Sequence, residues 1–184
     1  MTSVDAAPQT PTADLDSVPA GKPMSESRRE LSRVIWRANE NMFGSGKGTI
    51  ILEMIDDVAW ATAARHADGH AVTVSLDDMT FISPVWPGDV VSAYAQVEDT
   101  GRTSMDIGVY VSARRMKGSN DPEPVAEAHL VFVAVDDNGT PRPVRPVTPE
   151  TDTEYARHRA VAIRREHRKA LARALAEAAL PATR

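Results

Sequence analysis

The 184-residue sequence contains no cysteine, which excludes disulfide bonds, thiolate metal sites and a cysteine nucleophile. It also has no basic surplus, and its net charge of −5 argues against general binding to a phosphate backbone. No apolar run approaches the roughly 20 residues that span a bilayer. The first residues lack the basic and then apolar pattern of a secretory signal. We therefore expect a soluble cytoplasmic protein with no membrane span and no nucleic-acid partner.

Several motifs of enzymes and nucleotide-binding proteins are missing as well. There is no GxSxG nucleophile elbow and no HExxH zinc motif, and the five histidines are scattered, so no metal site is expected. The glycine-rich segment NENMFGSGKGT lacks the spacing of a phosphate-binding loop and its hydroxyl after the lysine. It precedes a predicted helix, whose first backbone N–H groups could still polarise a carbonyl or bind a phosphate.

What the sequence does contain is enough apolar residues, 42%, for the core of one domain with tails. Residues 1–25 are rich in Pro, Ser, Thr, Ala and Asp, and are predicted to form a disordered arm. Residues 26–148 are predicted to form the domain. Residues 149–184 are predicted to form a basic helical extension that lies on the surface or against a partner. Its apolar stripe is thin and consists of Tyr155, Val161, Ile163, Leu171 and Leu175.

The hydrophobic periodicity changes once along the domain. From Ile51 to Ala63, apolar residues recur every three or four positions, which predicts a largely buried helix that ends near Asp68-Gly69. Before it, the pattern of residues 31–37 predicts a short strand and leaves a helix as the alternative. After it, the period of two predicts strands at 71–81, 90–97, 104–115 and 125–135. One long helix with a run of antiparallel strands is an α+β arrangement.

Asp56 and Asp57 interrupt the apolar part of this helix. Adjacent helical positions point about 100° apart, so one carboxylate can face the core while the other faces solvent. A carboxylate on the buried side costs several kcal/mol unless it is paired, and its presence there would suggest a function. Periodicity alone leaves both residues, and a solvent-exposed pair, as open interpretations.

The order of several short motifs resembles the cytosolic acyl-CoA hydrolases of the hotdog superfamily, which include the YciA-like and brain-type thioesterases. In that family an Asn and a glycine loop precede a helix with an acidic residue, and a Val-Thr strand, a Phe-x-x-Pro turn and a Gly-Asp pair follow. The matching positions are Asn41, Gly44, Gly48, Asp56, Val72-Thr73, Phe81 with Pro84, Gly88-Asp89, and the later segment GRTSMDIGVYV. The resemblance runs from about Arg29 to about Pro146.

The resemblance implies an antiparallel sheet wrapped around one long central helix, in a homodimer at least, with a hexamer of three dimers as the expected assembly. It implies hydrolysis of acyl-CoA to free CoA and a carboxylic acid, without a separate cofactor. Asp56 would be the general base or the nucleophile. Asn41 of the partner subunit would position the water or the carbonyl. The N–H groups of Gly48 and Thr49 would stabilise the oxyanion.

Four further residues are predicted to bind CoA. Lys47 and Arg102 are candidates for its phosphates, and Thr73 and Ser104 could donate hydrogen bonds from strands. The chain departs from the family at Lys47-Gly48-Thr49, where a second glycine is usual, and Asn39 is a rival of Asn41. Two alternative functions stay open, a non-catalytic hotdog regulator that binds acyl-CoA and a hotdog dehydratase. The dehydratase would need a histidine beside Asp56.

Overall fold

The computed structural model describes residues 20–116 and 121–178. The elements are β1 (Lys22–Pro23), α1 (Met24–Ser27), β2 (Arg29–Val34), a 3₁₀ turn η1 (Arg37–Asn39), α2 (Gly48–Ala67), β3 (Ala71–Phe81), β4 (Val90–Thr100), β5 (Ser104–Arg114), β6 (Glu123–Ala134), β7 (Val147–Thr148) and α3 (Asp152–Ala178). The long helix, the four long strands and the C-terminal helix are confirmed.

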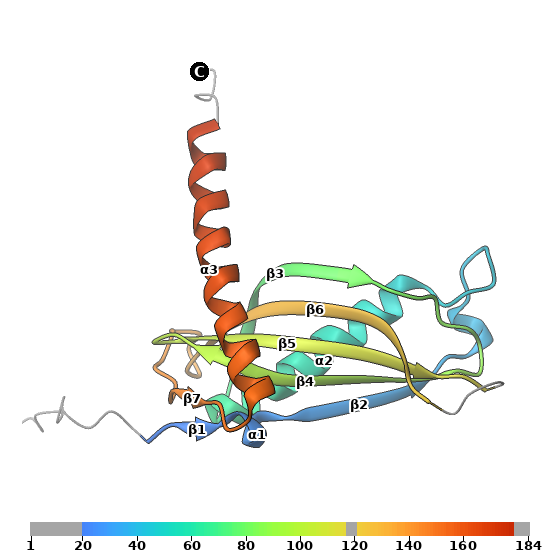
Figure 1. Ribbon diagram of the computed structural model, residues 1–184, viewed down its shortest axis with the longest axis horizontal. Coiled ribbons are helices and arrows are strands. Elements are labelled where there is room, and N and C mark those ends of the chain that lie inside the picture. Colours follow the sequence, from blue (N-terminus) through green and yellow to red (C-terminus); the bar gives the residue numbers. More distant parts are fainter. Residues whose placement is uncertain (1–19, 117–120, 179–184) are drawn as a thin grey trace, which may run out of the picture.

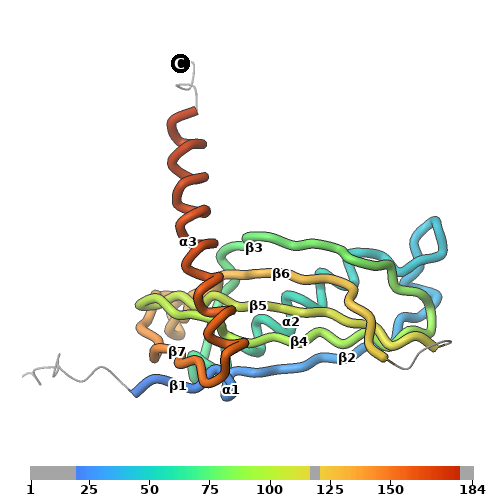
Figure 2. Tube along the Cα trace, in the orientation of Figure 1, coloured from blue at the N-terminus to red at the C-terminus, as the bar shows by residue number. Residues whose placement is uncertain are grey.

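A five-stranded antiparallel sheet with the order β2-β4-β5-β6-β3 curves around α2 (Figures 1 and 2). This is the hotdog arrangement, and the predicted fold class is therefore confirmed. The strand β3 lies at one edge of the sheet and pairs only with β6 among the described strands. Its register with β6 shifts twice, once between Thr73 and Ser75 and once between Leu76 and Asp78.

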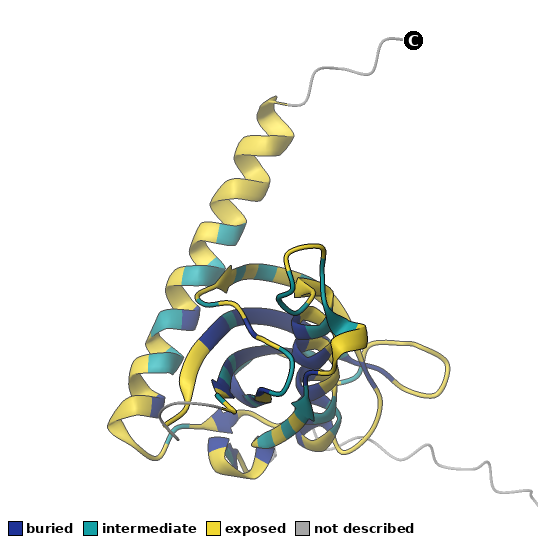
Figure 3. Cartoon of the chain, turned by 90° about the vertical axis from the view of Figure 1, so that its right-hand side faces the viewer, coloured by how far each residue is buried: buried dark blue, intermediate teal, exposed yellow. Residues whose placement is uncertain are grey.

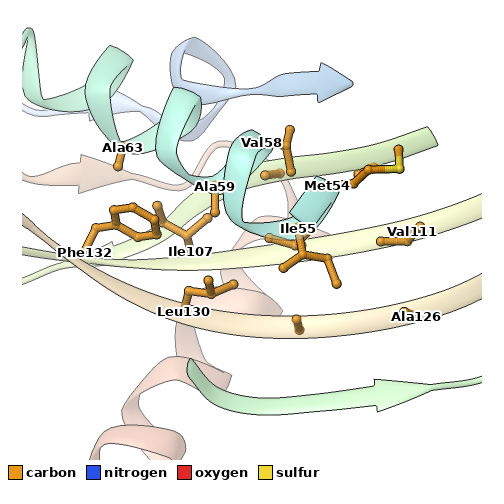
Figure 4. Packing of buried hydrophobic residues seen from close by; sticks show 14 of the residues in the cluster. Met54, Ile55, Val58, Ala59, Ala63, Ile107, Val111, Ala126, Leu130 and Phe132 are labelled. Carbon is orange, nitrogen blue, oxygen red and sulfur yellow. The ribbon is translucent and has the colours of Figure 1, made fainter. Parts of the chain in front are cut away.

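The core lies between α2 and the concave face of the sheet. Met54 and Ile55 lie four and three positions before Val58 on α2, and all three are almost fully buried, as the helical period requires. Figure 4 shows this side of α2 facing residues of β5 and β6 such as Ile107 and Phe132. The small side chain of Ala59 lets the helix approach the sheet closely.

The ordered chain begins earlier than predicted. Residues 1–19 lie outside the described residues, so the predicted arm is not tested there. The prediction is wrong for Lys22–Ser25, which form β1 and part of α1, because Met24 is fully buried in the core. The Lys22 ammonium donates to the carbonyl of His66 and to Asp68 at 2.8 and 2.7 Å, which stabilises the C-terminal end of α2.

The helix α3 crosses the convex face of the sheet, opposite α2 (Figure 1). A capping box begins it, because the Thr151 N–H donates to Glu154 and the Glu154 N–H donates to the Thr151 hydroxyl. Val161 is the only buried member of its predicted apolar stripe. Ion pairs between arginines of α3 and carboxylates of the strands hold it instead.

Candidate active site

Asp56 lies on the face of α2 that points away from the core, and it is exposed in the single chain, as is Asp57. Of the interpretations that periodicity left open, the single chain therefore shows the solvent-exposed pair. The four-residue spacing of Leu52, Asp56 and Trp60 places them in one exposed stripe along α2. Two large apolar side chains thus flank the carboxylate, each about half exposed.

Among the described residues, Asp56 has one hydrogen-bond partner, the hydroxyl of Thr73 on β3. This hydroxyl donates to Asp56 Oδ1 at 3.0 Å. The bond fixes one carboxylate oxygen and leaves Oδ2 free to accept a proton. Asp57 has no such partner among the described residues, so the geometry distinguishes the two aspartates where the sequence did not.

A shallow groove of about 450 Å³ runs between α2 and β3 beside this pair. Asp56, Thr73 and Thr49 supply polar groups to it, while Leu52, Leu76 and Leu130 make its apolar surface. Glu53 completes the lining. Sequence reasoning missed the leucines and Glu53, although the four-residue spacing of Leu52 and Asp56 was a usable signal for Leu52. The others come from strand positions that only the folded sheet brings together.

The loop before α2 holds Asn41 in a tight local network. Its amide donates to the Ser45 hydroxyl at 2.8 Å, and its side-chain oxygen accepts the Phe43 N–H at 2.8 Å. The rival Asn39 has a different role, because its side chain caps η1 by accepting the Trp36 N–H. No hydrogen bond joins Asn41 to Asp56 within the described chain. Asp56 lies about 12 Å along α2 from its first turn, at ~1.5 Å of rise per residue.

The first turn of α2 offers two free backbone donors. The Lys47 N–H donates to the Asn39 carbonyl and the Ile50 N–H to the Lys47 carbonyl. Within the described residues, no hydrogen bond accounts for the N–H groups of Gly48 and Thr49. Such groups at a helix N-terminus favour an anionic or polarised oxygen.

The four predicted CoA contacts do not meet in one chain. Lys47 is exposed at the start of α2, while Arg102 and Ser104 lie at the β4–β5 turn, at the opposite end of the sheet (Figure 1). The Thr73 hydroxyl is engaged by Asp56. The prediction of a common CoA site therefore depends on a second subunit and stays a prediction.

Histidines do not contribute to this groove. His66 is buried at the far end of α2, where its ring contacts the Arg145 carbonyl at 2.9 Å, and burial lowers the pKa of its imidazole. His70 is exposed near Asp137. The described residues contain no cluster of three potential metal ligands and no helix that is long and apolar enough to cross a membrane. The histidine that a dehydratase needs beside Asp56 is absent from the described residues.

A hotdog domain with a carboxylate on its helix beside an apolar groove is the arrangement of proteins that process thioesters. Comparison with known proteins shows to which family of that class the chain belongs. The sequence model of the Thioesterase superfamily matches residues 48–117. An uncharacterized acyl-CoA thioester hydrolase, YkhA, of Bacillus subtilis is 36% identical over 143 residues, which cover 76% of this chain and 81% of the relative. The cytosolic acyl coenzyme A thioester hydrolase of mouse is 28% identical over 140 residues, 76% of this chain and 37% of the mouse protein.

Solved structures of acyl-CoA hydrolases are also similar to this chain. An acyl-CoA hydrolase from Staphylococcus aureus, in complex with butyryl coenzyme A and coenzyme A, has a TM-score of 0.79 and 31% identity, and covers 86% of this chain and 96% of its own. A hexameric acyl-CoA thioesterase has a TM-score of 0.80 and 34% identity, with 83% and 97% covered. The chain belongs to the acyl-CoA thioester hydrolase family of the hotdog superfamily.

The S. aureus hydrolase has also been solved with an asparagine, an aspartate or a threonine replaced by alanine. In that protein the asparagine lies 15 positions before the aspartate and the threonine 17 positions after it. Asn41, Asp56 and Thr73 are separated by the same 15 and 17 positions. An asparagine, an aspartate and a threonine thus stand at the same spacing in both chains.

Proposed function

We propose that this protein hydrolyses acyl-CoA thioesters at a site centred on Asp56. The observation that carries the proposal is the Thr73–Asp56 hydrogen bond at the edge of an apolar groove, in a chain of the acyl-CoA thioester hydrolase family. The thioester would lie over Asp56 with its acyl chain against Leu52, Leu76 and Leu130. Coenzyme A enters as part of the substrate, and no separate cofactor is needed.

In the reaction, Asp56 Oδ2 takes a proton from a water molecule as the water oxygen attacks the thioester carbonyl carbon. The C–O bond forms and the carbonyl oxygen becomes an oxyanion. The C–S bond then breaks, the sulfur of CoA leaves with the proton held by Asp56, and a carboxylic acid remains. Direct attack by Asp56 through an acyl-enzyme anhydride is the alternative route.

A second subunit completes the site in this proposal. The edge strand β3 carries exposed Val72, Val74 and Leu76 beside the exposed stripe of α2, and a long apolar edge is a surface that proteins cover. Pairing two β3 strands would extend the sheet and bring the two α2 helices side by side. The stripe with Asp56 would then become buried between subunits.

The same pairing would bring groups of one subunit next to Asp56 of the other. Asn41, the Gly48 and Thr49 N–H groups and Lys47 from one subunit would meet Asp56 of the other, with Arg102 and Ser104 contributing to CoA binding. Known hexamers of this family support a trimer of such dimers, and the mouse relative's name supports a cytoplasmic location.

Thiol release from a panel of short, medium, long and aromatic acyl-CoAs tests the function. The wild-type protein should release CoA, and Asp56→Asn should lose at least about 1000-fold in kcat, as expected when a general base is removed. Asp57→Asn, one position along α2, should keep wild-type turnover. Saturable binding of acyl-CoA without thiol release would instead identify a regulator.

A further inference from the structure

The last ten described residues of α3 lie on the surface of the molecule. Every residue of Lys169–Ala178, here called the overhang, is exposed. In Figure 1 this part of the helix projects beyond the edge of the sheet formed by β3, and Figure 3 shows it as a continuously exposed segment. In proteins most of the stability of a helix comes from tertiary packing, so a surface that covers the overhang is to be expected.

The part of α3 before the overhang, residues 152–168, sets the direction of the overhang. Its ion pairs follow the order of the strands towards β3. Arg157 pairs with Glu98 on β4, Arg165 with Asp106 on β5 and, beyond β6, Arg168 with Asp77 on β3. β3 is the edge strand, so the next residues of α3 pass beyond the sheet. They enter the space that a second copy occupies when two β3 strands pair.

The side of α3 that faces the sheet carries different side chains before and after the β3 edge. Val161, Arg164, Arg168, Leu171 and Leu175 follow one another at intervals of three, four, three and four residues, and so lie on one side of the helix. Over the sheet, this side carries one buried valine and two paired arginines. On the overhang it carries two leucines that are 52% and 63% exposed.

A matching depression lies at the same edge. A groove of about 500 Å³ separates α3 from β3, lined on the strand by Ser75–Asp78 and on the helix by Ile163, Arg164, His167, Arg168 and Leu171. Leu76 and Ile163 make parts of it apolar and are themselves exposed. In a two-fold symmetric pair, the overhang of each copy would point towards this groove of the other, since such interfaces are self-complementary.

We propose that the overhang packs on the convex face of a second copy of this chain, across the joined β3 strands. Leu171 and Leu175 face the second copy's sheet beside its α3. Ten residues of helix extend ~15 Å, enough to cross about three strands. Each α3 helix thereby contacts both copies, on the face of the dimer opposite the two α2 helices, and this contact between copies is called the strap. This inference rests on the β3-paired dimer of the proposed function.

Hydrogen exchange with paired variants tests the strap. In the wild-type protein the amides of residues 170–178 should exchange at least about 100-fold more slowly than in L171E/L175E. The matched control A170E/R173Q changes the net charge by the same amount on the opposite side of the helix, and should keep wild-type protection. Amides of β3 should stay protected in all three proteins. Rapid exchange of the wild-type overhang while β3 is protected would overturn the proposal.

A photo-crosslinking residue in place of Leu175 identifies what covers the overhang. In a mixture of isotopically labelled and unlabelled chains, we expect crosslinks between copies that map to residues 71–81 or 152–168. Crosslinks confined to one chain would contradict the strap. A monomeric protein would overturn both the strap and the shared active site. A protected, crosslinked overhang in a protein that releases no thiol would refute only the catalytic proposal.

Discussion

Replacing Thr73 by valine removes the one hydrogen-bond donor to Asp56 that residues 20–116 and 121–178 provide. The hydroxyl donates at 3.0 Å, and hydrogen bonds to charged acceptors contribute about 1.5–3 kcal/mol. We take the lower end of this range, about 1.5 kcal/mol, which corresponds to slightly more than a tenfold loss in kcat. Valine keeps the shape and β-branching of threonine, so the free energy of unfolding should change little.

The assay for Thr73→Val is steady-state thiol release from the best acyl-CoA substrate. Thr80→Val is the matched control, because Thr80 is an exposed threonine of the same strand with no side-chain hydrogen bond among the described residues. We expect kcat to fall for Thr73→Val and KM to stay within about twofold, since the lost bond orients the carboxylate rather than the substrate. Wild-type kcat for Thr73→Val, or an equal loss for Thr80→Val, would refute this reasoning.

Two further predictions concern stability. Glu154 closes the capping box of α3 and pairs with Arg28 at 2.6 Å. Burial would raise the pKa of the Glu154 carboxyl, but the hydrogen bonds that it accepts outweigh burial, so its pKa is lowered. Glu154→Ala should therefore lower the free energy of unfolding by about 2 kcal/mol in urea titrations, whereas exposed Glu177→Ala should change it by less than about 0.5 kcal/mol; equal effects would contradict the capping role. Burial lowers the pKa of His66 below its ordinary 6.5, so the unfolded chain binds this proton more readily and stability should fall as the pH drops through 6.5. Thermal melts between pH 5 and 8 should show this loss in the wild type and a smaller one in His66→Gln, and identical slopes would rule out His66 as its source.

Local patterns in the sequence were sufficient to predict most of the fold. The three-to-four-residue spacing of Ile51, Met54, Ile55 and Val58 reports a helix packed on one side, and the alternation in the later strands reports a sheet with one covered face. Both patterns depend on burial inside one chain. The turn at Asp68 was also predictable, and the residue adopts the left-handed conformation with a φ of 53°.

What the sequence did not predict depends on contacts between distant segments. Met24 looked like part of a polar tail because its neighbours are small and polar, yet it fills the core. The exposure of Asp56 could not be decided from the sequence, because its neighbours one helical turn away, Leu52 and Trp60, are apolar and yet belong to a side of α2 that the single chain leaves open. Periodicity cannot separate burial within a chain from burial between chains.

Complementation between two inactive variants tests the shared active site most directly. Asp56→Asn and Asn41→Ala are each expected to be inactive as pure proteins, since every site then lacks one group. After the two are unfolded together and refolded at equal amounts, about half of the dimers should contain one copy of each, with one of their two sites intact.

The mixture should therefore recover about a quarter of the wild-type rate of thiol release from acyl-CoA. Refolding each variant alone provides the control and should give no recovery. A mixture that forms mixed dimers, shown by mass spectrometry, but releases no thiol would contradict a site built from Asp56 of one subunit and Asn41 of the other.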